Sequence, residues 1–329
     1  MTLQVGIDVT PLIQTQAGTA RYINGLLREL RGRRDIALHH VAFGGTARAW
    51  NVPRDALWYP FALRRVARGV DLLHCPTYRG PIDSRSPFVV TVHDLAIFRH
   101  SEAFNRWSRL YAPILVPRVL RAARRVIAVS AFTRRELVDV LGVSSDKIRV
   151  VPNAVEETFV SQGRSAGGEY VLAVGTLEPR KNIARIAEAT RRLGVELRVV
   201  GARGWGDVAV GDDGVRWLGR VPDEELAALY RGARVVAYPS LYEGFGIPVL
   251  EAMACGVPVV TSRGGAMEEI ADGAAELVDP LDAGAIAAGI ERAHERREEL
   301  VRRGFERARA FSWSAAAAAT VDVYREAIG

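Results

Sequence analysis

Residues 241–260 read LYEGFGIPVLEAMACGVPVV, and their order of turn, helix and strand signals indicates the fold. The two glycines of EGFG predict a turn, and Pro248 follows where proline suits the first turn of a helix. Gly256 marks the end of that helix, and the apolar run VPVV after it predicts a buried strand. The run RVVAYPS at 234–240 predicts a strand before the turn, so the stretch predicts two parallel strands joined by a helix.

The same alternation of strand-length and helix-length runs extends along the chain on both sides of SQGRSAGGE, a small and polar segment at 161–169. At 329 residues the chain is longer than one hydrophobic core usually serves. We therefore predict an α/β protein with two Rossmann-like doubly wound domains, at 1–160 and 161–310, followed by a helix within 311–329. The expected strands are 3–9, 36–43, 71–76, 87–94, 124–130, 148–155, 169–175, 196–201, 214–219 and 234–240, and the expected helices are 20–31, 131–142 (with Ser130 as N-cap), 182–194 and 223–232.

The composition is that of a folded globular protein, with 49% hydrophobic and 25% charged residues. No run approaches the ~18 apolar residues of a membrane helix, and MTLQVGIDV lacks the basic start and apolar core of a secretory signal. We therefore expect a cytoplasmic protein. Cys75 and Cys255 have no metal-type spacing and are expected to be buried free thiols.

The formal charge of +6 and the pI near 9.6 suit anionic partners. Basic residues gather at 64–68 and 118–125, but no nucleic-acid motif or aromatic-interleaved basic stripe accompanies them, so we expect no nucleic-acid partner. Two interpretations of these basic segments remain open. They are solvated helix faces, or they contact an anionic membrane surface.

Two carboxylates, Glu243 and Glu251, interrupt the apolar stretch at 241–260. Glycines before a helix leave its first N–H groups free to bind an anion, and the helix dipole adds about +0.5 charge there. We expect Glu251 in the first helical turn and Glu243 just before the turn, so that both flank this anion site. Carboxylates only accept hydrogen bonds, so their ligands would be hydroxyls, and phosphate with many hydroxyls describes a nucleotide sugar. The alternative is that Glu251 only complements the helix dipole and that Glu243 is a solvated loop residue.

A second segment, VLAVGTLEPRKNI at 171–183, also joins a strand and a glycine, Gly175, to a helix start, and it adds Arg180 and Lys181. The chain has only two lysines among 44 basic residues, so a lysine in this position indicates a specific role. Cations oppose the helix dipole at an N-terminus, which argues against an ordinary structural role. Each would bind a phosphate through charge-assisted hydrogen bonds worth about 1.5 to 3 kcal/mol.

With these motifs the chain resembles the GT-B glycosyltransferases, specifically the retaining family 4 type, over nearly all of its length. EGFGIPVLEAMACGVPVV resembles the E-x7-E motif of that family, and GTLEPRKNI resembles its donor-phosphate motif. RVIAVSAFTRREL, IRVVPNAV, VVGARGW and WLGRVPDEEL are similar to further segments of the family. PNAVE lacks the usual glycine and aspartate of the hinge motif. The resemblance implies two domains facing a central cleft, with the acceptor bound by the first and the nucleotide sugar by the second.

The resemblance also implies roles for single residues of the second domain. Glu243 would contact the donor sugar at the reacting centre, Glu251 would bind the ribose hydroxyls, and Arg180 and Lys181 would neutralise the leaving diphosphate. The remaining donor-binding residues would be Gly18, Gly175, Gly219, Arg220, Val221, Gly244, Phe245, Gly246 and Ile247.

In the first domain, PFVVTVHDL places His93 and Asp94 directly after a strand, as the family places its active-site histidine. A lone histidine after a strand is otherwise a core or surface residue. QAGTARY at 16–22 resembles the glycine-rich first loop of the family, with Ala17 in place of a second glycine and Gly18 close to a ligand. The segment FSWSAAAAATVDVYREA at 311–327 resembles the terminal helix that crosses back onto the first domain.

The expected reaction transfers a hexose or deoxyhexose from a nucleotide diphosphate to an acceptor hydroxyl, with no cofactor and no metal, because the chain has no Asp-x-Asp pair. GTLEPRKN with GARGW resembles members that transfer mannose or deoxyhexoses in polysaccharide assembly, so GDP-mannose is the expected donor. The acceptor would be a sugar, a lipid-linked sugar or a natural product. The alternatives are an NAD-dependent oxidoreductase, for which the glycines of GARGWGD have the wrong spacing, a nucleotide-sugar epimerase of the same architecture, and an inactive sugar-binding relative.

Overall fold

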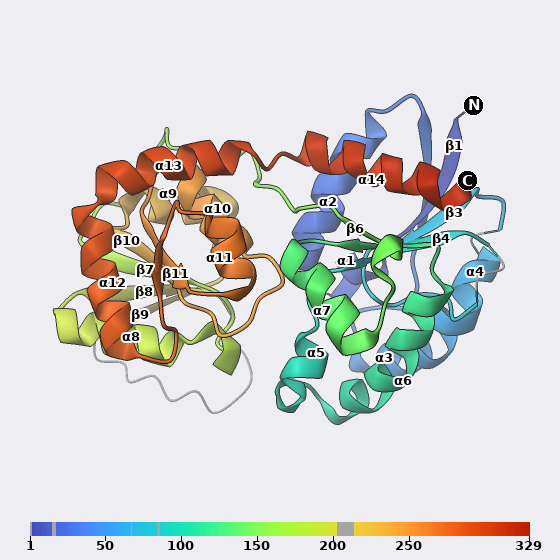
Figure 1. Ribbon diagram of the computed structural model, residues 1–329, viewed down its shortest axis with the longest axis horizontal. Helices are drawn as coiled ribbons and strands as arrows, with labels where there is room; N and C mark the ends of the chain where they lie inside the picture. The colour runs from blue at the N-terminus through green and yellow to red at the C-terminus, as the bar shows by residue number, and fades with distance from the viewer. Residues whose placement is uncertain (1, 15–17, 67, 84–85, 203–213) are drawn as a thin grey trace. The chain divides into compact units, whose positions relative to one another are not determined.

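The structure is a computed structural model that describes residues 2–14, 18–66, 68–83, 86–202 and 214–329. The chain forms two compact units, one of residues 1–154 with 312–329 and one of residues 155–311. Each unit has a parallel sheet with helices on both faces (Figure 1). The predicted α/β architecture with two Rossmann-like domains is confirmed.

The sheet of the first unit has six parallel strands in the order β2-β1-β3-β4-β5-β6. Strand order reverses beside β1 (Leu3–Asp8), as in doubly wound folds. The other strands are β2 (Ile36–Val41), β3 (Leu72–Cys75), β4 (Phe88–Val92), β5 (Arg125–Ala128) and β6 (Ile148–Val150). The helices are α1 (Thr10–Gln14), α2 (Gly18–Arg31), α3 (Asn51–Pro53), the π-helix η2 (Arg54–Ala62), α4 (Leu63–Val66), α5 (Ala96–Arg99), α6 (Arg106–Ala122), α7 (Ala131–Leu141) and α14 (Trp313–Ile328).

Two buried apolar layers cover the two faces of this sheet. On one face, η2, α6 and α7 bury side chains such as Trp58, Tyr111 and Leu137. On the other face, α2 packs beside α14, and the Trp313 ring fits so closely against Gly25 that a Cβ there would lie 2.3 Å from it. The C-terminal helix therefore supplies part of the core of the first unit.

The sheet of the second unit also has six parallel strands, in the order β12-β11-β10-β7-β8-β9. Helices α8 and α12 share one apolar layer with the sheet, and α10 packs against β10 and β11. The strands are β7 (Tyr170–Val174), β8 (Glu196–Val200), β9 (Val215–Gly219), β10 (Val235–Tyr238), β11 (Val259–Ser262) and β12 (Glu276–Val278). The helices are the 3-10 turn η5 (Pro179–Lys181), α8 (Ile183–Leu193), α9 (Asp223–Gly232), α10 (Ile247–Ala254), α11 (Gly265–Ala271), α12 (Ala283–Glu295) and α13 (Arg297–Arg309).

The boundary between the units differs from the expected position at 160 and 161, because residues 155–169 belong to the second unit. Arg231 of α9 donates hydrogen bonds to the carbonyls of Val160 and Arg164, at 3.0 and 2.7 Å. Phe159 packs edge-on against Tyr230. The polar segment at 161–169 is thus a surface loop fixed to α9, and its composition alone does not reveal this attachment.

Local signals place most elements where the sequence predicts them. The Ser130 side chain accepts a hydrogen bond from the Thr133 N–H as the predicted N-cap of α7, and Gly142 ends that helix with φ 61°. Helix α6 is not predicted, because Pro113 and Pro117 interrupt its apolar pattern. The cysteines are buried and free, as predicted. Within the described ranges, no helix combines the length and apolarity needed to cross a bilayer.

Candidate active site

Three glycines end neighbouring strands at one edge of the second sheet. The Gly175 N–H donates to the Val200 carbonyl, and the Gly201 N–H donates to the Gly219 carbonyl, both at 2.8 Å. A Cβ on Gly201 would lie 2.0 Å from the Gly175 carbonyl oxygen, so the chains here approach as closely as glycine permits. This edge is the carboxyl end of β7, β8 and β9, where ligands bind in doubly wound sheets.

A cluster of charges lies at the same edge, between the loops that follow β7 and β10. Lys181 donates to Glu243 and to the Tyr238 hydroxyl, the latter at 2.6 Å. Arg180 donates to the other Glu243 oxygen at 3.0 Å and pairs with Glu178 at 2.8 Å. The structure therefore brings together three predicted site residues from two separate sequence motifs.

Glu243 is held as a carboxylate by its neighbours. Burial raises its pKa, but Lys181, Arg180 and the Tyr238 hydroxyl outweigh burial and lower the pKa to about 2. Burial lowers the pKa of Lys181 and raises that of Tyr238. The alternative interpretation of Glu243 as a solvated loop residue is wrong, since its side chain is only 10% exposed.

Hydrogen bonds to neighbouring loops fix the turn that carries the two cations. Asn182 adopts φ 60°, and its side-chain amide donates to the carbonyls of Pro239 and Pro280, at 2.9 and 2.6 Å. The Leu241 N–H donates to the Arg180 carbonyl at 2.8 Å. The loops after β7 and β10 are thus joined directly, which fixes Lys181 and Arg180 beside Glu243.

Three residues that orient the cluster are not predicted from the sequence: Glu178, Asn182 and Tyr238. Asn182 stands beside Lys181 in PRKN, and Tyr238 ends the strand RVVAYPS. A polar residue at the carboxyl end of a buried strand is a signal that could have identified Tyr238.

The glycine turn before α10 has the conformation that a helix entry requires. Gly246 has φ 106°, and a Cβ on it would lie 2.3 Å from the Met267 methyl group. Pro248 lies in the first turn of α10, as predicted. Phe245 is buried edge-on against Phe311, so its side chain anchors the turn. The roles of Gly244, Phe245, Gly246 and Ile247 toward a diphosphate stay predictions.

Glu251 is not in the first turn of α10, which corrects the expectation from sequence. The helix begins at Ile247, so Glu251 lies one turn further along and does not complement the helix N-terminus. Its side chain is 1% exposed, and its carboxylate accepts a hydrogen bond from Tyr230 of α9 at 2.9 Å. The predicted binding of ribose hydroxyls by Glu251 stays a prediction.

Gly219, Arg220 and Val221, which are expected to bind the donor, lie at the carboxyl end of β9. Gly219 ends β9 with φ 68° and has open space where a Cβ would be, and Arg220 beside it is exposed. Val221 is half-buried. The segment GARGW, which is similar to a donor-domain segment of the family, extends into 203–213 and so lies partly outside the described residues.

In the first unit, His93 follows β4 at the carboxyl end of the strand, as predicted. Its Nε2 lies 3.0 Å from the Pro76 carbonyl, and its ring meets the Tyr22 ring edge-on at 4.9 Å. A carbonyl only accepts, so Nε2 carries the proton, and Nδ1 of the neutral ring is an acceptor. Burial lowers the pKa of His93. Gly18 is the exposed first residue of α2, and Ala17 lies outside the described residues.

A series of buried side-chain hydrogen bonds lies behind His93. The Tyr22 hydroxyl is 2.9 Å from the Thr91 hydroxyl, which is 2.9 Å from His74 Nε2, and His74 Nδ1 is 2.7 Å from the Tyr324 hydroxyl. Burial lowers the pKa of His74 to about 3. These contacts join α2, β4, β3 and the terminal helix α14 behind the candidate histidine.

No group of three or more His, Cys, Asp or Glu side chains among the described residues is arranged to hold a metal ion. The cations that the geometry offers to a phosphate are those of Arg180 and Lys181.

Comparisons with known proteins agree with this geometry. Residues 154–310 match the family described as glycosyl transferases group 1, and residues 16–159 match glycosyltransferase family 4. O-antigen chain mannosyltransferase B of Escherichia coli is 34% identical over 265 residues, which are 72% of this chain and 70% of that protein. The chain belongs to glycosyltransferase family 4.

Solved structures show the same GT-B fold. Sucrose-phosphate synthase of Thermosynechococcus elongatus superposes with a TM-score of 0.77 at 21% identity, over 98% of each chain. HepE of Anabaena, solved in complex with UDP-glucose, superposes with a TM-score of 0.73 at 17% identity, over 98% of this chain and 99% of that one. The predicted family is confirmed, and so is glycosyltransferase activity.

Proposed function

We propose that this family 4 enzyme transfers a hexose or deoxyhexose, with retention and without a metal, from a nucleotide-diphosphate sugar to an acceptor hydroxyl. One observation carries the proposal. Lys181 and Arg180 converge on the Glu243 carboxylate at the ligand-binding edge of the second sheet. This arrangement offers cations for a diphosphate and an acceptor of hydroxyl hydrogen bonds for a sugar.

The charges of the cluster balance, because Arg180 and Lys181 are matched by Glu178 and Glu243. A diphosphate entering this cluster competes with Glu243 for the two cations. In the proposed complex the cations bind the diphosphate, and Glu243 turns to the hydroxyls of the donor sugar. The donor thus exchanges one set of charge-assisted hydrogen bonds for another of similar strength.

In the proposed reaction, the bond from the anomeric carbon to the diphosphate breaks and a bond to the acceptor oxygen forms on the same face of the sugar. The acceptor proton passes to the leaving phosphate oxygen. Lys181 and Arg180 stabilise the negative charge that develops there, which is the preorganised electrostatic effect that enzymes use most. His93 is proposed to accept a hydrogen bond from the donor sugar through Nδ1, a role that rests on the family resemblance.

GDP-mannose is the proposed donor, and the pathway is polysaccharide or glycoconjugate assembly. The support is the 34% identity to an O-antigen chain mannosyltransferase over most of both chains. The roles of Gly18, Gly175, Gly219, Arg220, Val221, Ile247 and Glu251 in holding this donor are part of the same proposal.

Thermal unfolding with UDP, GDP, ADP, dTDP and NAD in turn tests the donor site. A ligand at 100 times its Kd adds about 2.7 kcal/mol to the folded state, which raises Tm by several degrees. We expect GDP to raise Tm in the wild type and Glu251→Ala to lose the rise. A rise with a different nucleoside diphosphate would replace GDP, whereas a rise with NAD alone would overturn the proposal. Product formation from GDP-mannose with acceptor present then distinguishes transfer from epimerisation.

A further inference from the structure

We propose that Tyr238 is a positioning residue for glycosyl transfer, which holds the Lys181 ammonium in place when the donor diphosphate displaces Glu243. The inference rests on the proposed function, since it concerns a cation that would bind the leaving diphosphate. It extends that function to a residue that the family resemblance does not assign.

Tyr238 lies at the point of the second sheet where ligands are expected. It ends β10, and Lys181 lies in the turn after β7. These strands are neighbours where the strand order reverses, and ligands of doubly wound sheets bind in the crevice at this point. The Tyr238 carbonyl accepts hydrogen bonds from the Thr261 hydroxyl at 3.0 Å and from the Ser240 N–H at 2.9 Å. The backbone of Tyr238 is thus fixed at the ligand-binding edge.

Lys181 is held along its whole length. Its ammonium donates to the Tyr238 hydroxyl at 2.6 Å and lies over the Tyr238 ring, 5.0 Å from the ring centre, where the ring attracts a cation. Its aliphatic stem lies against Gly175, where a Cβ would be 3.2 Å from Lys181 Cδ. The Tyr238 hydroxyl in turn donates to Glu243 at 3.0 Å. This hydroxyl therefore accepts from the cation and donates to the carboxylate.

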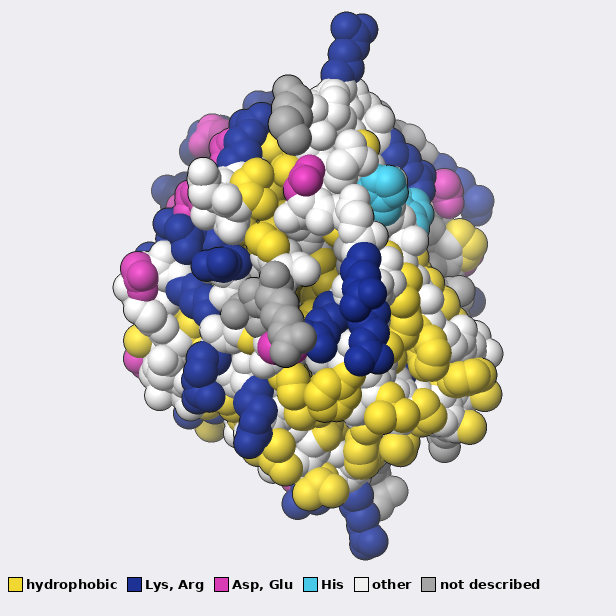
Figure 2. Space-filling view, turned by 90° about the vertical axis from the view of Figure 1, so that its right-hand side faces the viewer, with side chains coloured by type: hydrophobic (Ala, Val, Ile, Leu, Met, Phe, Trp, Pro, Cys, Tyr) yellow, Lys and Arg dark blue, Asp and Glu magenta, His cyan; other side chains and the backbone are white. Residues whose placement is uncertain are grey.

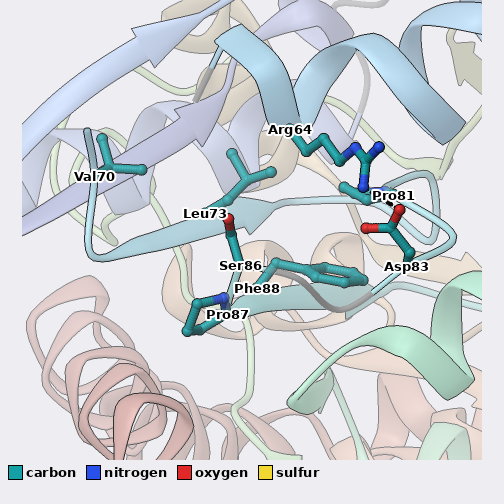
Figure 3. Close-up of a pocket in the computed structure, with 8 residues that line it drawn as sticks. All are labelled: Arg64, Val70, Leu73, Pro81, Asp83, Ser86, Pro87 and Phe88. Carbon is teal, nitrogen blue, oxygen red and sulfur yellow. Dashed lines mark hydrogen bonds and ion pairs between the residues drawn. The ribbon is translucent and has the colours of Figure 1, made fainter. Parts of the chain in front are cut away.

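Lys181 depends on these partners because little water reaches it. Its side chain is 12% exposed, and burial lowers its pKa. Other cations of the chain lie in water, as the Lys and Arg side chains on the face in Figure 2 show. Arg64 lies beside a small pocket of the first unit, and its partner Asp83 is 38% exposed (Figure 3), whereas Glu243 is 10% exposed. Protein groups must therefore keep Lys181 protonated.

Donor binding changes which groups do so. Besides the effect of burial, Glu243 and Glu178 raise the pKa of Lys181. Arg180 lowers it. In the proposed complex the diphosphate takes the place of Glu243, which turns to the donor sugar. Burial raises the pKa of Tyr238, so Tyr238 is neutral and its ring and hydroxyl stay with the ammonium without adding a charge that competes with the diphosphate.

Direct titration of Lys181 tests this contact. The chain has two lysines, so protein labelled with 15N at lysine Nζ gives two side-chain signals in NMR spectra, and Lys147→Arg assigns the signal of Lys181. We expect Tyr238→Phe, which keeps the ring, to lower the pKa of Lys181 by about 1 pH unit, because the ammonium loses a hydrogen-bond acceptor. The Lys147 signal is the internal control and should not move. An unchanged pKa of Lys181 would overturn the proposal, whichever donor the enzyme uses.

Steady-state kinetics with GDP-mannose test the consequence for transfer. We expect Tyr238→Phe to lower kcat about tenfold and to change KM less than about twofold, because the charge that Lys181 stabilises develops in the transition state. Tyr170→Phe is the matched control, since it removes from β7 a buried hydroxyl that donates to the Leu229 carbonyl at 2.6 Å. This control should keep both constants of the wild type.

The two experiments separate this inference from the proposed function. An equal loss of kcat in Tyr238→Phe and Tyr170→Phe, or a rise of KM alone in Tyr238→Phe, would overturn the positioning role. If the wild type shows no turnover while the titration shows the expected shift, GDP-mannose is wrong as the donor, and the contact of Tyr238 with Lys181 stands.

Discussion

At the scale of single residues, Glu243 is the carboxylate that binds both cations of the candidate active site. Its carboxylate competes with any bound diphosphate for Lys181 and Arg180. We therefore predict that Glu243→Gln binds the nucleoside diphosphate product about tenfold more tightly, which corresponds to about 1.4 kcal/mol, while kcat falls. Isothermal titration with GDP and a turnover assay measure the two effects separately. Weaker GDP binding in the variant would show that the carboxylate does not compete with the ligand.

Lys181 allows a second test at the same scale, because the chain offers a matched control. Lys181→Ala should lower kcat/KM by about 100- to 1,000-fold, as expected for the loss of one preorganised electrostatic partner. The fold should persist, since Arg180 and Tyr238 still bind Glu243. Lys147, the other lysine, bonds a backbone carbonyl in the first unit, and Lys147→Ala should leave kcat/KM unchanged. An effect of Lys181→Ala below twofold would remove this residue from the mechanism.

At the scale of secondary-structure elements, the strand ends of the second sheet depend on glycines in unequal ways. Gly201 and Gly219 both have positive φ, but only the Cβ of Gly201→Ala would meet backbone, at 2.0 Å from the Gly175 oxygen. Gly219→Ala should cost about 1 to 2 kcal/mol of unfolding free energy from its φ alone. Gly201→Ala should cost at least twice as much, because β7 and β8 must separate. Urea denaturation measures both variants, and equal losses would contradict the close approach of the strands.

The buried hydrogen bonds of His74, which join β3, β4 and α14, predict that acid destabilises the first unit. Below pH 6.5 the unfolded chain protonates His74, whereas the folded chain does not until about pH 3. The unfolding free energy should therefore fall by about 1.4 kcal/mol per pH unit as the pH falls through this window. The contribution of His74 to stability is fully present above pH 6.5. Asp8, whose pKa burial raises to about 6, acts in the opposite direction.

The His74 contribution is measured by comparison with His74→Gln, which cannot titrate. Urea unfolding at pH 7 and pH 5, followed by tryptophan fluorescence, should show a loss about 2 kcal/mol smaller in the variant than in the wild type. An equal loss in both proteins would mean that His74 is accessible to protons in the folded state.

At the scale of the whole molecule, the two units differ in how the chain builds them. Residues 155–311 form one continuous unit, but residues 1–154 need 312–329 to complete their core. We predict that a fragment of residues 155–311 melts cooperatively, whereas 1–154 alone does not. Burial of a large apolar side chain contributes about 1.5 to 3 kcal/mol, so losing Trp313, Val321 and Tyr324 removes most of a typical stability.

Restoring the terminal helix distinguishes this explanation from general fragility of the fragment. Fusion of residues 312–329 to 1–154 through a glycine–serine linker should recover cooperative unfolding, measured by calorimetry. The same fusion with Trp313→Ala and Tyr324→Ala is the control and should not recover it. Cooperative melting of 1–154 without the helix would show that α14 is dispensable.

The sequence by itself determined the α/β alternation, the parallel sheets and the motifs that carry Arg180, Lys181, Glu243 and His93. These features follow from local properties: apolar periodicity, glycine and proline at turns, and residue spacing within one segment. The same local reasoning missed α6, whose two prolines interrupt its pattern, and it placed the domain boundary too late.

Only the tertiary structure decided that Glu243 binds Lys181 and Arg180, that Tyr230 donates a hydrogen bond to Glu251, and that Arg231 fixes the loop at 161–169 to α9. Each of these contacts joins residues that are distant in sequence or lie on separate elements. Their partners are set by how strands and helices pack, which no periodicity within a single segment encodes.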